Sequence, residues 1–111
     1  MVDDFKLQII QNDIKLSQKY DIIYFFIENI IQNQQYIKDT TNKISTLSED
    51  EDKIRFDLYQ NLSYIKFEID DLFKNLFSIA PNIEPGILNT FLVNEKYESE
   101  DIKIFILDNC F

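Results

Sequence analysis

Helix-breaking residues are confined to one short stretch of this 111-residue chain. Its one glycine and two prolines all lie within residues 81–86, as Pro81, Pro85 and Gly86. Glycine and proline most often interrupt helices, and residues 1–80 contain neither. Tight β-hairpins also depend on glycine, so a sheet protein is disfavoured. The sequence therefore predicts an all-α fold with long helices before residue 81.

The apolar content indicates that the whole chain folds. Hydrophobic residues make up 45% of the sequence, which argues against a disordered chain. A chain of this length is typical of one domain and can bury a core without a disulfide or a metal. We therefore expect residues 1–111 to form a single acidic helical domain.

Apolar residues recur at helical spacing in two long segments. In residues 19–38 they step by threes and fours, and the polar run Thr40-Thr41-Asn42 is expected to end this helix. In residues 48–79 one stripe is formed by Ile54, Leu58, Leu62, Ile65, Ile69, Leu72 and Leu76. Since short connections favour antiparallel neighbours, we predict that both segments form the core pair of an antiparallel bundle of four to five helices.

Local signals predict the other helix ends. Ser48-Glu49-Asp50-Glu51 is a capping-box sequence with Ser48 at the N-cap. Ala80-Pro81 is expected to end the second long helix, because proline drives the residue before it out of the helical region. Pro85 is expected to open a short helix, and Ser99 to cap a last helix. The apolar face of that last helix is expected on Ile102, Phe105 and Ile106.

Residues 3–17 allow two interpretations. Leu7, Ile10 and Ile14 fit one face of a short helix followed by a turn, which is the interpretation we favour. Apolar residues in this segment also alternate around Asn12-Asp13, as they would in a hairpin.

The side chains that most enzymes use are missing. The chain has no histidine, its one cysteine is Cys110, and Gly86 stands alone, so no glycine-rich phosphate loop is present. The acids at 49–51 follow one another on a helix and therefore point around its axis instead of converging on a metal ion. We expect no catalytic residue, no metal site and no cofactor, and a chain that is not an enzyme.

The net charge of the chain limits the classes of partner that it is expected to bind. The formal net charge is −9, and residues 46–111 carry fourteen acids against six bases. Direct binding to nucleic acid or to an anionic membrane needs clustered Lys and Arg, so neither is expected. The acidic start, the unpaired cysteine and the shortness of the longest apolar run, Ile22–Ile27, favour a cytoplasmic protein. A basic protein is the partner that the charge favours.

The second long helix is predicted to carry an acidic ridge. Its members step by threes and fours and are Asp57, Asn61, Tyr64, Glu68, Asp71 and Asn75. None of the three acids has Lys or Arg four residues later, where an exposed helix commonly pairs its charges. A plain solvated face is the alternative. The partner-binding residues predicted here are Asp57, Tyr64, Phe67, Glu68, Asp70 and Asp71.

Two phenylalanines point away from the apolar stripe of the same helix. Phe56 and Phe67 are eleven residues apart and therefore face the same way, almost opposite the stripe. We expect them to be buried on a second side of a central helix, since buried aromatics are the usual case. The alternative is that they are exposed at an interface, with a basic partner or in a homodimer.

Acidic segments in the second half of the chain resemble segments of a known protein family. Residues Glu68-Ile69-Asp70-Asp71-Leu72-Phe73, then Pro81, and then Tyr97-Glu98-Ser99-Glu100-Asp101-Ile102-Lys103 resemble small bacterial immunity proteins that neutralise a nuclease toxin, the colicin D immunity-like group in particular. The segment Lys6 to Glu28 is similar to the N-terminal part of such proteins. The resemblance implies an antiparallel helix bundle whose acids imitate nucleic-acid phosphates and occupy a basic toxin cleft.

The function expected from the sequence is inhibition of a basic protein. We expect an immunity protein or antitoxin that binds and blocks a nuclease toxin. A phage-encoded inhibitor of a host defence nuclease, of the anti-CRISPR type, would use the same opposite-charge attraction. A structural or scaffolding homodimer built on Phe56 and Phe67 is the alternative from another class.

Overall fold

The computed structural model describes residues 4–93 and 98–111, and within them it contains five α-helices and no strand. The helices are α1 (Asp4–Asn12), α2 (Ile14–Ser45), α3 (Asp52–Ile79), α4 (Pro85–Leu92) and α5 (Ser99–Asn109). The predicted all-α class is confirmed. Helix α1 and the turn at Asp13 confirm a short helix over the hairpin, but α2 already begins at Ile14, which is exposed and does not continue the face of Leu7 and Ile10.

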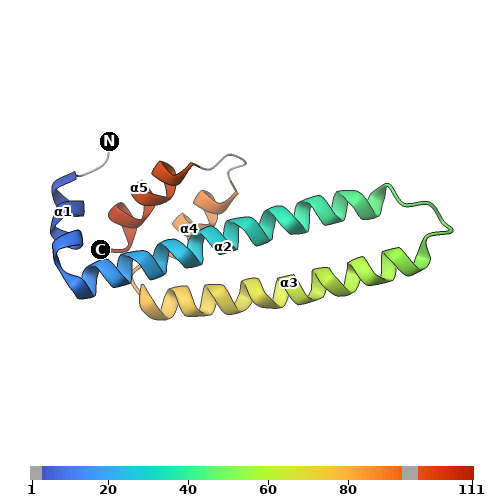
Figure 1. Cartoon of the computed structure of the whole chain (residues 1–111), viewed down its shortest axis with the longest axis horizontal. Helices are drawn as coiled ribbons and strands as arrows, with labels where there is room; N and C mark the ends of the chain where they lie inside the picture. The colour runs from blue at the N-terminus through green and yellow to red at the C-terminus, as the bar shows by residue number, and fades with distance from the viewer. Residues whose placement is uncertain (1–3, 94–97) are drawn as a thin grey trace.

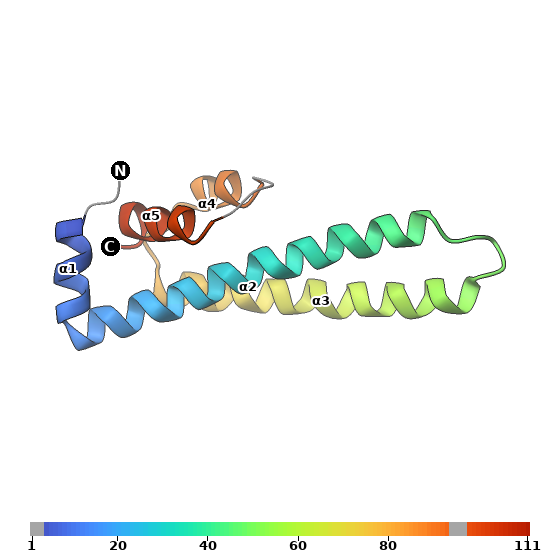
Figure 2. The same cartoon turned by 45° about the horizontal axis from the view of Figure 1, so that its top comes forward.

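Helices α2 and α3 run antiparallel along the whole molecule, as predicted (Figure 1). The other three helices gather over one end of this pair, which Figure 2 shows from a second side. The molecule is therefore elongated, with extents of 58 × 25 × 22 Å. No residue between Ile31 and Leu72 belongs to the main core cluster. We call residues 32–68 the arm, because there only α2 and α3 pack against each other.

The core lies where α2, α3, α4 and α5 meet. Helix α2 contributes Ile23, Ile27 and Ile30, which are fully buried, and α3 contributes Leu76. The expected face of the last helix is confirmed, since Ile102, Phe105 and Ile106 are all buried. The α3 stripe is buried at Leu62, Ile69 and Leu76. Ile54, at the outer end of the arm, is 47% exposed because no third helix covers it.

The predicted end of the first long helix is wrong. Helix α2 continues through Thr40-Thr41-Asn42 to Ser45. Thr40 is buried, so packing along the arm stabilises the helix where local propensity is weak. The Ser45 hydroxyl donates to the Asn42 carbonyl oxygen at 2.6 Å, and the Thr46 hydroxyl donates to that of Lys43 at 2.8 Å. These hydroxyls satisfy last-turn carbonyls, which explains why the helix ends there.

The predicted start of the second long helix is also wrong. Helix α3 begins at Asp52, four residues after Ser48. The Ser48 hydroxyl donates to the Glu51 carboxylate at 2.9 Å, so the two side chains bond to each other instead of to backbone N–H groups. Arg55 donates to the Ser48 carbonyl oxygen at 2.9 Å and holds residues 48–51 as a turn.

The other predicted ends are close to those observed. Helix α3 stops before Ala80-Pro81 and α4 opens at Pro85, both as predicted. The N-cap of α5 is Glu98, one residue before the predicted Ser99. Its side chain and that of Asp101 form a reciprocal capping box. In the described part of the chain, no helix combines the length and the apolar character needed to cross a bilayer.

Candidate functional site

The six predicted partner-binding residues all lie on α3, but the structure brings only five of them together. Tyr64, Phe67, Glu68, Asp70 and Asp71 fall within about two turns of α3, and we call them the acidic–aromatic face. Tyr64 is 63% exposed and Phe67 is 72% exposed. Asp70 and Asp71 are exposed and Glu68 is half-buried. Asp57 is exposed about 16 Å before Glu68 along the helix axis, so it belongs to another part of the surface.

A groove between the two long helices opens beside this face. It has a volume of about 280 Å³. Helix α2 lines it with Phe25, Asn29 and Asn33, and α3 lines it with Glu68, Asp71 and Leu72. We call it the α2–α3 groove. Glu68 and Asp71 of α3 therefore lie along one wall of the same groove.

The α2 wall of this groove is the part that sequence reasoning missed. Phe25 lies in the middle of the longest helix and is nevertheless 58% exposed. The sequence carries a signal for it, because Phe25, Asn29 and Asn33 follow one another at intervals of four residues beside the buried stripe. Sequence alone does not say that these residues meet Glu68 and Asp71, which are about forty positions away.

A second hollow lies on α3 alone. It has a volume of about 220 Å³ and is lined by Phe67, Asp70, Asp71 and Lys74. Asp71 therefore borders both cavities. Lys74 shares this hollow with the two aspartates, so Asp71 has a positive charge nearby although the position four residues later is Asn75. No ion pair joins Lys74 to Asp71 in the described part of the chain, so Lys74 offsets the charge of Asp71 only in part.

The Tyr64 phenol lies about one turn before Glu68 on α3. A hydrogen bond to the Glu68 carboxylate, with its charge, raises the pKa of Tyr64 above the ordinary value. Within the described part of the chain, Arg55 pairs with Asp52 and Lys103 with Glu100, whereas neither Glu68 nor Asp71 has an ion-pair partner. Both carboxylates of the groove therefore keep their capacity to bind an incoming cation.

The expected burial of Phe56 and Phe67 is wrong. Their side chains are 61% and 72% exposed. Helix α3 packs against α2 along its length, and α1, α4 and α5 gather elsewhere, so the outer side of α3 is covered by nothing in the described part of the chain (Figure 2). The alternative weighed for these rings, exposure on the surface, is the observed one.

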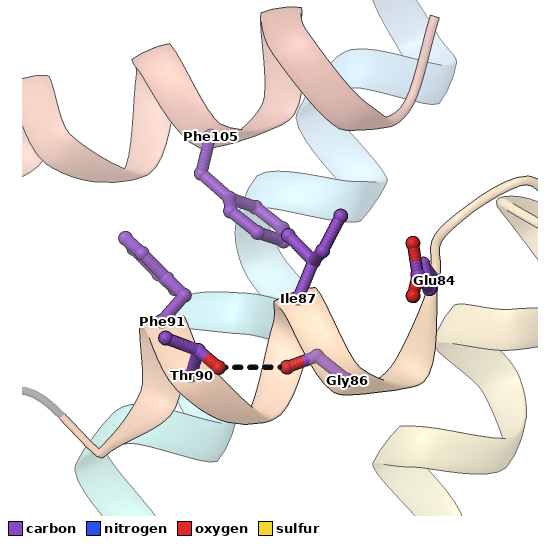
Figure 3. A pocket seen from close by; sticks show the side chains of 6 residues that line it. All are labelled: Glu84, Gly86, Ile87, Thr90, Phe91 and Phe105. Carbon is purple, nitrogen blue, oxygen red and sulfur yellow. Dashed lines mark hydrogen bonds between the residues drawn. The ribbon is translucent and has the colours of Figure 1, made fainter.

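A third cavity lies between α4 and α5 (Figure 3). It has a volume of about 420 Å³ and is lined by Glu84, Gly86, Ile87, Thr90, Phe91 and Phe105. The rings of Phe91 and Phe105 stack with centroids 4.5 Å apart. The Thr90 hydroxyl already donates to the Gly86 carbonyl oxygen at 2.9 Å. One carboxylate among apolar walls provides no pair of nucleophile and base, so these residues do not suggest a reaction.

Cys110 lies in the core. Burial raises the pKa of its thiol to about 12. A thiol that stays protonated is a poor nucleophile and a poor metal ligand. Among residues 4–93 and 98–111, no three side chains of the His, Cys, Asp or Glu type are placed to hold a metal ion.

No family model matches this chain, and no curated protein and no solved structure matches it. The resemblance to the colicin D immunity-like group therefore stays an expectation from the quoted segments. Tyr97, which opens the second of those segments, lies outside the described residues.

Proposed function

We propose that this chain is an acidic inhibitor that binds a basic protein through the acidic–aromatic face of α3, and that the class of target is a nuclease, as for an immunity protein or antitoxin. One observation carries the proposal. Glu68 and Asp71 have no ion-pair partner in the described part of the chain and lie beside the exposed rings of Tyr64 and Phe67.

The chemistry of a nuclease suits such a face. A protein that binds nucleic acid neutralises phosphates with clustered Lys and Arg, so its substrate cleft is basic. Carboxylates can occupy these positions through charge-assisted hydrogen bonds. Exposed aromatic rings beside the acids supply the apolar anchors that dominate many protein interfaces. A net charge of −9 on the inhibitor would also speed its encounter with a basic target.

The shape of the molecule supports the same proposal. The arm, residues 32–68, extends beyond α1, α4 and α5 (Figure 1). The acidic–aromatic face lies at and just beyond its base, on the outer side of α3. A partner can therefore approach this face without displacing the helices that form the core.

A pair of double charge reversals tests the proposal. The tagged chain is used to capture proteins from cells of its source, and the nuclease activity of each retained protein is measured with and without the chain. Glu68→Lys with Asp71→Lys should abolish both capture and inhibition. Glu49→Lys with Asp50→Lys changes the net charge equally at exposed residues outside the face and should preserve both.

Circular dichroism and melting curves show whether both variants fold. Retention of the same nuclease at equal affinity by the Glu68→Lys, Asp71→Lys variant would exclude the acidic–aromatic face as the binding surface. A toxin and a phage-defence nuclease would both be captured through the same charge, so capture alone does not separate the two inhibitor types. The identity of the retained nuclease does.

A scaffolding homodimer is the second candidate, and the exposure of Phe56 and Phe67 favours it. Both rings lie on the uncovered side of α3, where a second copy has access. Light scattering distinguishes the candidates: a concentration-dependent dimer that Phe56→Ser with Phe67→Ser dissociates would support scaffolding. A monomer at all concentrations would leave inhibition of a basic partner as the function.

A further inference from the structure

We propose that the α2–α3 groove is a slot for one arginine side chain of the basic partner. This inference rests on the proposed function and deepens it, because it names the chemical group that the acidic surface recognises. The groove lies next to the acidic–aromatic face and shares Glu68 and Asp71 with it. Its volume of about 280 Å³ is below the range of typical small-molecule pockets, so it fits a single side chain better than a separate ligand.

The α2 wall offers an aromatic surface to a flat cation. Phe25 is 58% exposed, and the half-buried Leu72 lines the same groove. Guanidinium groups stack on aromatic faces and are more weakly hydrated than ammonium groups, so they lose less on entering a partly apolar groove. The apolar stem of an arginine would lie along Leu72.

The α3 wall offers acceptors for the same group. Glu68 and Asp71 are three residues apart and therefore lie on one side of the helix. A guanidinium has five N–H donors in a fixed plane, and it forms its strongest bonds with carboxylates. The side chains of Asn29 and Asn33 add amide oxygens from α2. A lysine ammonium has only three donors around a point charge and gains less from these two walls.

Parts of the slot are held in place before a partner arrives. The amide nitrogen of Asn29 donates to the Phe25 carbonyl oxygen at 2.7 Å, which leaves the amide oxygen as an acceptor. Both walls belong to helices that are packed against each other, so little ordering is needed when a cation binds.

Three amino-acid derivatives test the slot directly. The isotope-labelled chain is titrated by NMR with the N-acetyl methylamides of arginine, lysine and citrulline, the last being a neutral analogue of arginine. We expect saturable shifts at Phe25, Asn29, Asn33, Glu68 and Asp71 with arginine. Lysine should produce weaker shifts and citrulline none. Asp71→Asn should weaken the arginine titration about tenfold, as expected for one lost charged hydrogen bond.

Two further variants make the test specific. Phe25→Leu should also weaken the arginine titration, whereas Asp50→Asn removes an equal charge at an exposed residue outside the groove and should leave it unchanged. Two results would overturn the proposed slot. One is arginine-induced NMR shifts of equal size at acids over the whole surface, and the other is an Asp71→Asn chain that binds the arginine derivative as wild type does. Melting curves of all three variants show that each remains folded.

The two sets of experiments distinguish a wrong arginine slot from a wrong proposed function. If the Glu68→Lys, Asp71→Lys chain loses its partner while arginine never titrates the groove, the slot is wrong and the function stands. If arginine titrates the groove but no basic protein is captured or inhibited, the slot stands and the proposed function is wrong.

Discussion

The Lys6 ammonium donates a hydrogen bond to the backbone oxygen of Phe111 at 3.1 Å, and so joins α1 to the chain beyond α5. The same ammonium donates to the Leu107 carbonyl oxygen in the last turn of α5. Lys19 of α2 lies 5.2 Å from the centre of the Phe111 ring. Two cations therefore hold the end of α5, where unpaired carbonyl groups and the helix dipole favour positive charge.

Removing the Lys6 charge should loosen this end of the molecule. Lys6→Met keeps most of the apolar stem and should lower the free energy of unfolding by about 1–2 kcal/mol, through lost hydrogen bonds from a charged donor. Urea denaturation measures the change. Lys15→Met is the control, because Lys15 is exposed and forms no contact of this kind in the described part of the chain. Equal stability of both variants would contradict the role of Lys6.

Two positions of one apolar stripe should respond very differently to truncation. Leu76→Ala should cost about 2–5 kcal/mol, because Leu76 is fully buried in the core that α2, α3, α4 and α5 form. Ile54→Ala should change stability by less than about 0.5 kcal/mol, as expected for a surface position. Chemical denaturation of the two variants compares them. Similar losses at both positions would mean that the arm is covered by a third layer in solution.

Removing the two candidate N-caps, Asp13 and Ser48, should lower stability by different amounts. The Asp13 carboxylate accepts from the Leu16 backbone N–H at 3.1 Å, so Asp13→Ala should destabilise the protein by about 1 kcal/mol. Ser48→Ala should have a smaller effect, because the Ser48 hydroxyl bonds to a side chain in an exposed turn. Melting temperatures decide between them. A larger loss for Ser48→Ala would restore the N-cap that the sequence predicted there.

Cys110 should be unreactive in the folded protein. Burial raises the pKa of its thiol to about 12 from an ordinary value of 9.0, an effect that outweighs the opposing charges of Lys19 and Lys6. Thiol reagents at pH 8 should therefore label the chain only after it unfolds. Rapid labelling without denaturant would show that the end of α5 opens readily.

The same shift predicts a dependence of stability on pH. The unfolded chain releases the thiol proton at a lower pH than the folded chain, so the stability that Cys110 contributes falls as pH rises from about 9 to 12. Cys110→Ala lacks this proton. The difference in unfolding free energy between wild type and Cys110→Ala should therefore shrink over that range, and a constant difference would contradict the raised pKa.

Lys74 should weaken the attraction for a basic partner. It shares a hollow with Asp70 and Asp71 and offsets part of their charge. Lys74→Gln should therefore speed association with the captured nuclease a few-fold, and rising salt should reduce the gain. Lys43→Gln, at an exposed position near the end of α2, is the control with an equal charge change. Stopped-flow measurements compare the rates, and equal rates for both variants would place the interface elsewhere.

Local pattern alone determined much of this protein. Two properties of short segments predicted the helices and the buried side of α3. One is the absence of glycine and proline before Pro81, and the other is the spacing of apolar residues by three and four positions. The end of α3 at Ala80-Pro81 and the start of α4 at Pro85 follow from proline geometry in the same way. The acids of α3 and the ring of Tyr64 were found from spacing on one helix.

Only the tertiary structure decided which sides of these helices are covered. Helix α2 extends past Thr40 because that residue packs in the arm, and Phe56 and Phe67 are exposed because no helix covers the outer side of α3. The α2–α3 groove joins Phe25 to Asp71 across 46 positions of sequence. Such contacts depend on how two helices are aligned against each other. That alignment is set by the summed packing of many side chains and is not encoded in the periodicity of either helix.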